Sequence, residues 1–220
     1  NSDEAETEVA LARKALEGAM SEAAAAEVGL RVKATIAGNP ATGVARTATE
    51  IAADLIIMNL PRSEEALRKL LGEGLDSVLR HTRKTVFVCG FQKPIANHTG
   101  IVVVAPPRAE QEAGFSTWAG KLIRLATELS VPIRIHCNQA THEAIVELAG
   151  SLKATVDLAF SEFEDWEDFF IVSRGLQDSD LIVLVAARRN AVSFNSHLQQ
   201  LPVKLERYFS ESSKILVYPQ

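Results

Sequence analysis

The chain has 220 residues, of which 47% are hydrophobic and 23% charged, values typical of a globular protein with a sizeable core. Its formal charge is −5, because 28 acidic residues outnumber 23 basic ones, and the acidic excess lies in residues 1–30. With no basic excess to hold a phosphate backbone and no apolar run of ~18 residues, the sequence argues against a nucleic-acid binder and against a membrane helix.

The first 90 residues are predicted to alternate between helices and strands. Ala, Glu, Leu and Lys dominate residues 3–27, which is typical of a helix. Residues 30–36 alternate apolar and polar side chains, which indicates a strand, and 54–58 are apolar on both faces, which favours a parallel strand covered by helices on both sides. The predicted order is helix 3–27, strand 30–36, helix from Pro40, strand 54–58, helix 63–81 and strand 85–89.

A linker is predicted over 90–100, because this stretch contains Pro94, Asn97 and Thr99. Strict alternation follows it, which predicts an α/β fold with a doubly wound parallel sheet and right-handed crossovers. The predicted elements are strand 101–104, helix 112–129, strand 132–136, helix 142–149, strand 155–160, helix 166–176, strand 181–185, helix 198–209 and strand 214–218.

The sequence contains an internal repeat. Ala53-Asp-Leu-Ile-Ile-Met58 matches Ser179-Asp-Leu-Ile-Val-Leu184, and Lys84-Thr-Val-Phe-Val88 matches Lys214-Ile-Leu-Val-Tyr218. Counted backward from these strands, the first copy has room for its third strand but not for its first strand, first helix and second strand. We therefore predict a truncated module over 1–90 that lacks its N-terminal β-α-β, a linker over 91–100 and a complete module over 101–220.

Two stretches of the first copy resemble a known family. They are Gly38-Asn39-Pro40-Ala41 through Asp54-Leu-Ile-Ile-Met58, and Leu70-Leu71-Gly72 through Thr85-Val-Phe-Val88. They look like the universal stress protein family, in which they correspond to the region of strands three and four and to the fourth helix and fifth strand. The resemblance implies a Rossmann-like parallel sheet with strand order 3-2-1-4-5. It covers most of 30–90 by residue and 101–218 by architecture.

Nucleotide-binding members of that family carry Gly-x2-Gly-x9-Gly-Ser/Thr after strand four, where backbone N–H groups hold phosphates. In this sequence Asn59, Arg62 and Gly72 occupy the three glycine positions, and Glu73 replaces the hydroxyl residue. In the second copy Ala186–Phe194 replaces the loop. Both nucleotide sites therefore look degenerate.

A narrower likeness concerns the end of the chain. Leu184-Val-Ala-Ala-Arg-Arg-Asn-Ala-Val-Ser-Phe194, with a final strand and Tyr218-Pro219 near the end, is similar to the final module of certain bacterial cation/proton (sodium/hydrogen) antiporters. The resemblance implies a non-catalytic regulatory or assembly domain on the cytoplasmic side of the inner membrane, with a membrane transport domain upstream as its partner. The opening at Asn1 without Met fits a piece of a longer protein.

Two other hypotheses remain open at the level of sequence. One is a soluble tandem stress protein that binds adenine nucleotide at the loop of Asn59, Arg62 and Gly72. The other is an interaction module without a ligand. A homodimer is also expected, because missing strands would leave a sheet edge exposed.

Arg188, Arg189 and Asn190 follow strand 181–185, at the edge where open α/β sheets bind ligands. Two guanidinium groups there are able to grip a phosphate or carboxylate, so we predict a site for a small anionic ligand. The alternative is a solvated loop or a salt bridge to an acidic helix.

No catalytic set is predicted, because no Ser, His and Asp stand in a nucleophile-elbow context. His136, Cys137 and His142 provide three metal ligands at most, and neighbours on a strand point to opposite faces. We therefore expect neither a metal nor a cofactor. Five acids between Glu162 and Asp168, with aromatics interleaved, predict the start of an amphipathic helix, with a cation-sensing patch as the alternative.

Overall fold

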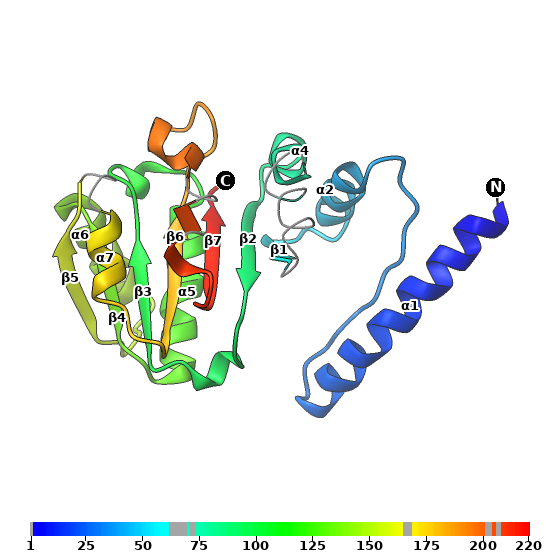
Figure 1. Ribbon diagram of the computed structural model, residues 1–220, viewed down its shortest axis with the longest axis horizontal. Helices are drawn as coiled ribbons and strands as arrows, with labels where there is room; N and C mark the ends of the chain where they lie inside the picture. The colour runs from blue at the N-terminus through cyan, green and yellow to red at the C-terminus, as the bar shows by residue number, and fades with distance from the viewer. Residues whose placement is uncertain (1, 62–69, 71–73, 165–168, 201–203, 206–207) are drawn as a thin grey trace.

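A seven-stranded sheet with helices on both faces forms the body of the protein (Figure 1). The computed structural model describes residues 2–61, 70, 74–164, 169–200, 204–205 and 208–220. The strand order is β1-β2-β7-β6-β3-β4-β5, and every neighbouring pair except β2 and β7 is parallel. The predicted α/β class with a doubly wound parallel sheet is therefore confirmed.

The strands lie close to their predicted positions. They are β1 (Leu55–Asn59), β2 (Thr85–Gly90), β3 (Gly100–Val104), β4 (Ile133–Cys137), β5 (Leu158–Glu162), β6 (Asp180–Val185) and β7 (Lys214–Tyr218). β3, β6 and β7 are buried along their whole length, as expected for apolar parallel strands between two helical layers.

The helices described are α1 (Ser2–Ala25), α2 (Pro40–Glu50), α4 (Leu75–His81), α5 (Phe115–Leu129), α6 (Gln139–Ser151) and α7 (Phe169–Arg174), with short 3-10 helices η2 (Ile95–Asn97), η3 (Ala109–Gln111) and η5 (Ser196–Gln200). Asn39 caps α2 by accepting a hydrogen bond from the backbone N–H of Ala41 at 2.8 Å. α1 stands away from the sheet at the end of an extended arm (Figure 1).

The second part of the chain has the strand order that the family resemblance implies. From the edge inward the strands are β5, β4, β3, β6 and β7, which is 3-2-1-4-5 in that part's own order. α5 and α6 cover one face, where Trp118 and Ile145 pack against Ile101 and Val183. α7 and α4 cover the other face.

β2 and β7 join the two parts of the chain into one sheet. They pair antiparallel, with Val88 opposite Leu216 near the middle of the pair. The strand pairs on either side, β1–β2 and β6–β7, end in equivalent hydrogen bonds. Just after β1, Leu60 N–H donates to the Cys89 carbonyl, and just after β6, Ala186 N–H donates to the Val217 carbonyl, both at 2.8 Å. Because the central pair is antiparallel, the carboxyl ends of β1 and β6 lie at opposite ends of the sheet.

Two predictions about the first 60 residues are wrong. Residues 30–36 form no strand, because no described strand pairs with this segment and an extended chain needs a partner for its backbone groups. β1 is not covered on both faces either. Ile57 is 68% exposed, because no described helix lies over that face of β1.

Smaller differences concern element boundaries. The strand predicted over 155–160 begins at Leu158. Of the helix predicted over 63–81, α4 is described, while 62–69 and 71–73 lie outside the described residues. The predicted linker contains η2 and is tied to the turn before β6, where Thr99 Oγ1 donates to Ser179 Oγ at 2.7 Å.

Candidate functional site

The carboxyl ends of β3 and β6 define the candidate site. These strands are neighbours, and the chain leaves them toward opposite faces, into α5 after β3 and toward η5 after β6. Such a switch point opens a crevice in which doubly wound proteins bind ligands. Here the loop after β3 (105–114) and the loop after β6 (186–195) flank the switch point.

A buried carboxylate joins these two loops. Glu112 is 8% exposed, and its Oε1 accepts hydrogen bonds from the backbone N–H of Ser193 at 2.8 Å and from the Ser193 hydroxyl at 2.7 Å. A backbone N–H beside a hydroxyl is the kind of donor pair that holds an anionic oxygen. The protein's own side chain therefore occupies these donors. The sequence reasoning missed this pair, because nothing local relates residues 81 positions apart.

The guanidinium of Arg188 is not available to bind an anion as predicted, because it donates hydrogen bonds to backbone carbonyls. Nε donates to the Pro219 carbonyl at 2.7 Å, Nη1 to the carbonyls of Leu79 and Thr82, and Nη2 to the Lys84 carbonyl. Burial lowers the pKa of this guanidinium. A cation at the carboxyl end of α4 is also favoured by the helix dipole. Arg188 thus clamps the loop after β6 to the connection between α4 and β2.

Arg189 and Asn190 lie on the surface beyond the clamp. The Arg189 side chain is 76% exposed and stands 3.9 Å from the carboxylate of Asp76 on α4. Asn190 is exposed and has a φ of 71°, a left-handed conformation that asparagine tolerates in turns. Arg188 and Arg189, predicted to grip one anion together, therefore have different partners.

The predicted nucleotide loop of the first copy is placed only in part. Asn59 is the last residue of β1 and is exposed, opposite Cys89 in the parallel register. Arg62 and Gly72 lie outside the described residues. Since β1 and β6 run in opposite directions, Asn59 lies at the other end of the sheet from Arg188, so the two sets of candidate residues do not form one site.

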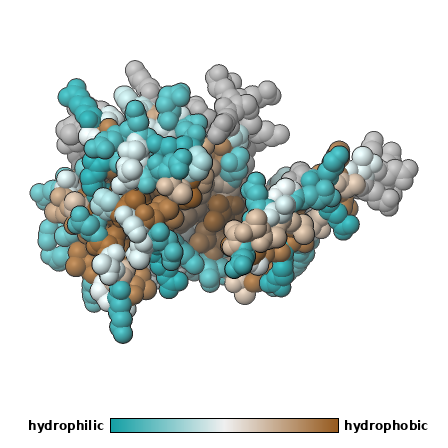
Figure 2. All heavy atoms as spheres, turned by 90° about the horizontal axis from the view of Figure 1, so that it is seen from below, coloured by the Kyte–Doolittle hydropathy of each residue, from teal (hydrophilic) through white to brown (hydrophobic). Residues whose placement is uncertain are grey.

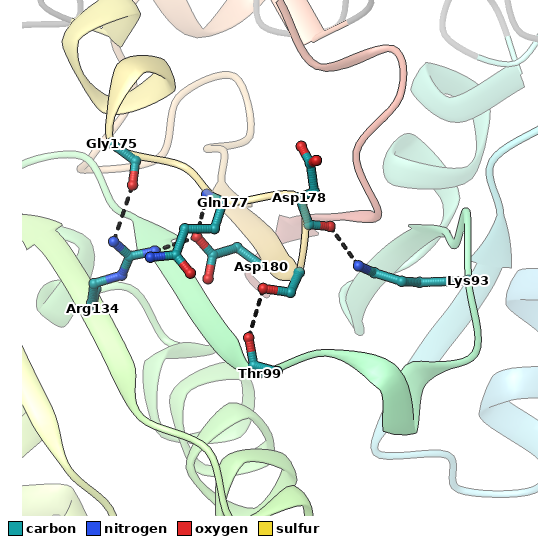
Figure 3. Close-up of polar contacts among 8 residues, drawn as sticks. Lys93, Thr99, Arg134, Gly175, Gln177, Asp178 and Asp180 are labelled. Atoms are coloured by element: carbon teal, nitrogen blue, oxygen red, sulfur yellow. Dashed lines mark hydrogen bonds and ion pairs between the residues drawn. The ribbon is translucent and has the colours of Figure 1, made fainter.

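A hollow of about 360 Å³ lies between α7 and the sheet. Arg134 lines it, forms an ion pair with the buried Asp180 and donates to the Gly175 carbonyl at 3.1 Å (Figure 3). Gln177 N–H also donates to Asp180, at 2.8 Å. The cluster fixes the turn that leads into β6, so Arg134 serves as a structural cation. The lining residues are Val102, Arg134, His136, Ala159, Ser161, Glu162, Phe163, Glu164, Val172, Gly175 and Leu176.

His136 lies in the same hollow. Its burial, together with the nearby Arg134 charge, lowers the pKa of the imidazole, so the neutral form is favoured. Cys137 packs on the opposite face of the sheet, as alternation along a strand requires. In the part of the chain that the structure describes, no three His, Cys, Asp or Glu residues are grouped so that they would hold a metal ion.

Both cysteines are free and buried against the face that α5 and α6 cover. Burial raises the pKa of the Cys89 thiol to about 11 and that of Cys137 to about 12, with Glu110 adding to the second shift. Neither thiol is therefore available as a thiolate nucleophile at neutral pH. This agrees with their predicted role as small core residues.

Part of the acidic and aromatic stretch near α7 is described. Phe163 and Phe169 are 5% and 2% exposed and belong to the core under α7, but the predicted helix start is not seen at Glu162, which ends β5, or at Phe163, which lies in no helix. Residues 165–168, which carry most of the acids, lie outside the described residues. The cation-sensing alternative stays a hypothesis.

Comparisons with known proteins agree with this fold. Residues 1–90 match the Universal stress protein family. A universal stress protein from Archaeoglobus fulgidus DSM 4304 superposes with a TM-score of 0.57 at 15% identity, over 95% of this chain and 76% of that one. A functionally unknown protein from Pseudomonas aeruginosa PAO1 gives a TM-score of 0.55 at 13% identity, over 94% and 78%. No curated protein matches the chain.

The helices were also compared with the requirements of a membrane span. None of those described combines the length and the apolar character needed to cross a bilayer.

Proposed function

We propose that the chain is a regulatory and assembly domain that carries out no catalysis, and that its parent is a bacterial monovalent cation/proton antiporter. The universal-stress-protein-like fold supports the first part. The likeness of 184–194 and of Tyr218-Pro219 to antiporter terminal modules supports the second. In this proposal the domain lies on the cytoplasmic side of the inner membrane, next to the transport domain.

The proposal that no nucleotide binds at the carboxyl ends of β3 and β6 rests on the hydrogen bonds that Glu112 accepts from Ser193. A phosphate at this edge of the sheet would compete with the Glu112 carboxylate, which already accepts hydrogen bonds from both donors of Ser193. It would also meet that negative charge in a buried setting, where repulsion is poorly screened. This contact disfavours nucleotide binding at the carboxyl ends of β3 and β6, whereas the alternative of a soluble protein that binds adenine nucleotide places the ligand at the loop of Asn59, Arg62 and Gly72.

The joint between the two parts of the chain supports an assembly role. The β2–β7 pairing and the hydrogen bonds of Arg188 join both parts in one sheet, which supports the proposal that a contact made on one part would also affect the other. Regulation of transport would then require that the transport domain contacts this rigid body differently in its two states.

The test is cation/proton exchange in vesicles that hold the parent transporter. The intact protein is compared with a form that ends before residue 1, at equal amounts in the membrane. We expect removal of the domain to shift the pH or cation dependence of exchange or to change the oligomeric state. The exposed variant Arg189→Ala serves as a matched control and should behave as the intact protein.

Two results would overturn the proposal in separable ways. Unchanged exchange, unchanged pH dependence and unchanged oligomeric state after removal would refute the regulatory role. An upstream coding sequence without apolar runs of about 18 residues would refute the antiporter and favour a soluble stress protein.

A further inference from the structure

A hollow of about 600 Å³ lies between α5 and the connection from α4 to β2. One wall is formed by Arg83 and Lys84, immediately ahead of β2, and the other by residues of α5. The pair of Glu112 and Ser193 does not line it, so it is separate from the switch point described above. We call it the basic hollow, because of the charges that line it.

Close contacts hold the two walls of the basic hollow in place. Gly114, which precedes α5, lies so near the start of β2 that a Cβ atom built on it would stand 2.8 Å from Thr85 Oγ1. On the other wall, the Arg188 guanidinium donates hydrogen bonds to the carbonyls of Thr82 and Lys84. The hollow is therefore built from two segments that the fold holds at fixed positions.

One face of α5 provides the second wall. Thr117, Lys121 and Arg124 are spaced four and three residues apart, so they lie on one side of the helix. Gly120 lies between them, is buried and has no side chain, which leaves room beside the helix. The two cations of this wall thus face the same space as the two ahead of β2.

Four cations and one carboxylate line the basic hollow. The cations are Arg83, Lys84, Lys121 and Arg124, and the carboxylate is Asp54, which gives a formal charge of +3. Among the described residues, none of the four cationic side chains forms an ion pair or a hydrogen bond, and neither does Asp54. The positive charge of the hollow is therefore not neutralised by the chain itself.

Several other cations of the body do have partners in the protein. Arg134 forms an ion pair with Asp180, and Lys93 donates a hydrogen bond to the Asp178 carbonyl. Like charges that are gathered without a counter-charge repel one another and attract anions from solution. The basic hollow is thus suited to an anion from outside the chain.

The remaining lining residues narrow the chemistry of that anion. Ser116 and Thr117 contribute hydroxyl groups, which can donate hydrogen bonds to anionic oxygens. Leu152 is the one aliphatic side chain among the described residues of the lining, and none of these is aromatic. The hollow therefore offers no surface on which a base could stack, and it fits a phosphate group recognised by charge.

We propose that the basic hollow receives the phosphate headgroups of anionic phospholipids and thereby docks the domain on the membrane surface. The membrane as the source of the phosphate rests on the proposed function, which places the domain beside a bilayer. An anionic bilayer attracts each Lys or Arg near its surface and offers phosphates to all four cations at once. A free phosphate compound would meet exposed cations that water and salt screen, and would bind weakly.

The position of the hollow gives this docking a direction. Because Val86 pairs with Tyr218, the segment ahead of β2 lies at the carboxyl end of β7, which is at the top in Figure 1. Figure 2 views the molecule from below and shows a hydrophobic recess beside the arm that carries α1. Docking through the basic hollow would turn the carboxyl ends of β6 and β7 toward the membrane and the recess away from it.

Flotation with vesicles tests the proposal. The 220-residue protein is mixed with vesicles of phosphatidylglycerol and phosphatidylcholine in equal parts, and with vesicles of phosphatidylcholine alone. We expect binding to the first kind only. Two double variants, Lys121→Gln with Arg124→Gln and Arg83→Gln with Lys84→Gln, should each weaken it about 10- to 30-fold, because each removes two cations from the surface.

The matched control removes the same charge elsewhere. Arg13→Gln with Lys14→Gln changes two exposed cations of α1 and should bind the vesicles as the unmodified protein does. The melting temperatures of all three double variants should equal that of the unmodified protein, which shows that a loss of binding is not a loss of folding.

Three results would overturn the proposal. They are no binding to the anionic vesicles, weakening by only one of the two double variants of the hollow, and equal weakening by the control. Displacement by millimolar inorganic triphosphate at constant ionic strength would overturn it as well, and would assign the hollow to a soluble phosphorylated ligand. The regulatory role is decided by the exchange measurement on the parent transporter, so the two proposals fail separately.

Discussion

The guanidinium of Arg188 donates a hydrogen bond to the backbone carbonyl of Leu79, which lies 109 residues earlier in the chain, at 2.7 Å. Leu79 belongs to the last turn of α4, where carbonyls have no partner within the helix. With its further bonds to Thr82, Lys84 and Pro219, this one side chain ties the loop after β6 to the first part of the chain. The residue that sequence suggested as a ligand contact is a structural clamp.

Removal of this clamp should weaken the whole protein. Arg188→Ala leaves carbonyls of the α4–β2 connection without their charged donor, and we expect a loss of about 2–4 kcal/mol in the free energy of unfolding. Arg189→Ala, at a side chain that is 76% exposed, should change it by less than about 0.5 kcal/mol. Urea unfolding of both variants measures the difference. Equal stabilities would show that the clamp contributes nothing.

The hydrogen bonds between Glu112 and Ser193 predict that the two residues are energetically coupled. Glu112→Ala and Ser193→Ala should each destabilise the protein by about 1–3 kcal/mol, because each leaves a buried polar partner unsatisfied. In a double-mutant cycle the two substitutions should be non-additive, with a coupling of about 1–2 kcal/mol. Chemical denaturation of the four proteins provides the values. Strict additivity would contradict a direct contact in solution.

The lowered pKa of His136 predicts a loss of stability in mild acid. Below the unfolded-state pKa of about 6.5 the unfolded chain binds a proton that the folded protein does not, so the stability falls as the pH falls toward the lower folded pKa. His136→Gln should flatten this part of the curve between about pH 7 and pH 5. His81→Gln, at an exposed histidine, is the control and should leave the slope unchanged. Thermal melts across this pH range measure the effect. If the stability of His136→Gln still falls with pH as steeply as that of the unmodified protein, the pH dependence does not come from His136.

The raised thiol pKa values predict inert cysteines. Because the pKa of the Cys89 thiol is raised to about 11 and that of Cys137 to about 12, both thiols are protonated at pH 8, and both are buried. A thiol-specific reagent should modify the native protein at least about 100-fold more slowly than the protein in denaturant. Rapid modification of one cysteine in the native protein would mean that its strand opens frequently.

The core of the fold could be predicted from local patterns. Apolar runs such as Leu181–Val185 fixed the buried strands, and Asn39-Pro40 marked the start of α2 through capping chemistry. The segment 30–36 shows the limit of this reasoning. Its alternation is that of a strand, but a strand forms only where a neighbour offers hydrogen bonds, and no local signal reports whether that neighbour is present.

The candidate site was less predictable for the same reason. The position of Arg188 at the carboxyl edge of the sheet followed from the topology. The atoms that its guanidinium meets lie more than 100 residues earlier in the sequence, or at Pro219 after the last strand. Glu112 looked like part of a helix start, and only the folded chain brings it to Ser193. Local sequence patterns do not indicate which distant residue a polar side chain will contact.

The central claim is that the hydrogen-bond donors of Ser193, at the carboxyl ends of β3 and β6, are occupied by the protein's own Glu112. It is tested most directly by titrating ATP into the folded 220-residue protein in a calorimeter, with Glu112→Ala measured beside it. We predict no binding heat for the unmodified protein up to millimolar nucleotide. Micromolar binding that is lost when the loop after β6 is altered would contradict the account and assign the chain to the nucleotide-binding stress proteins.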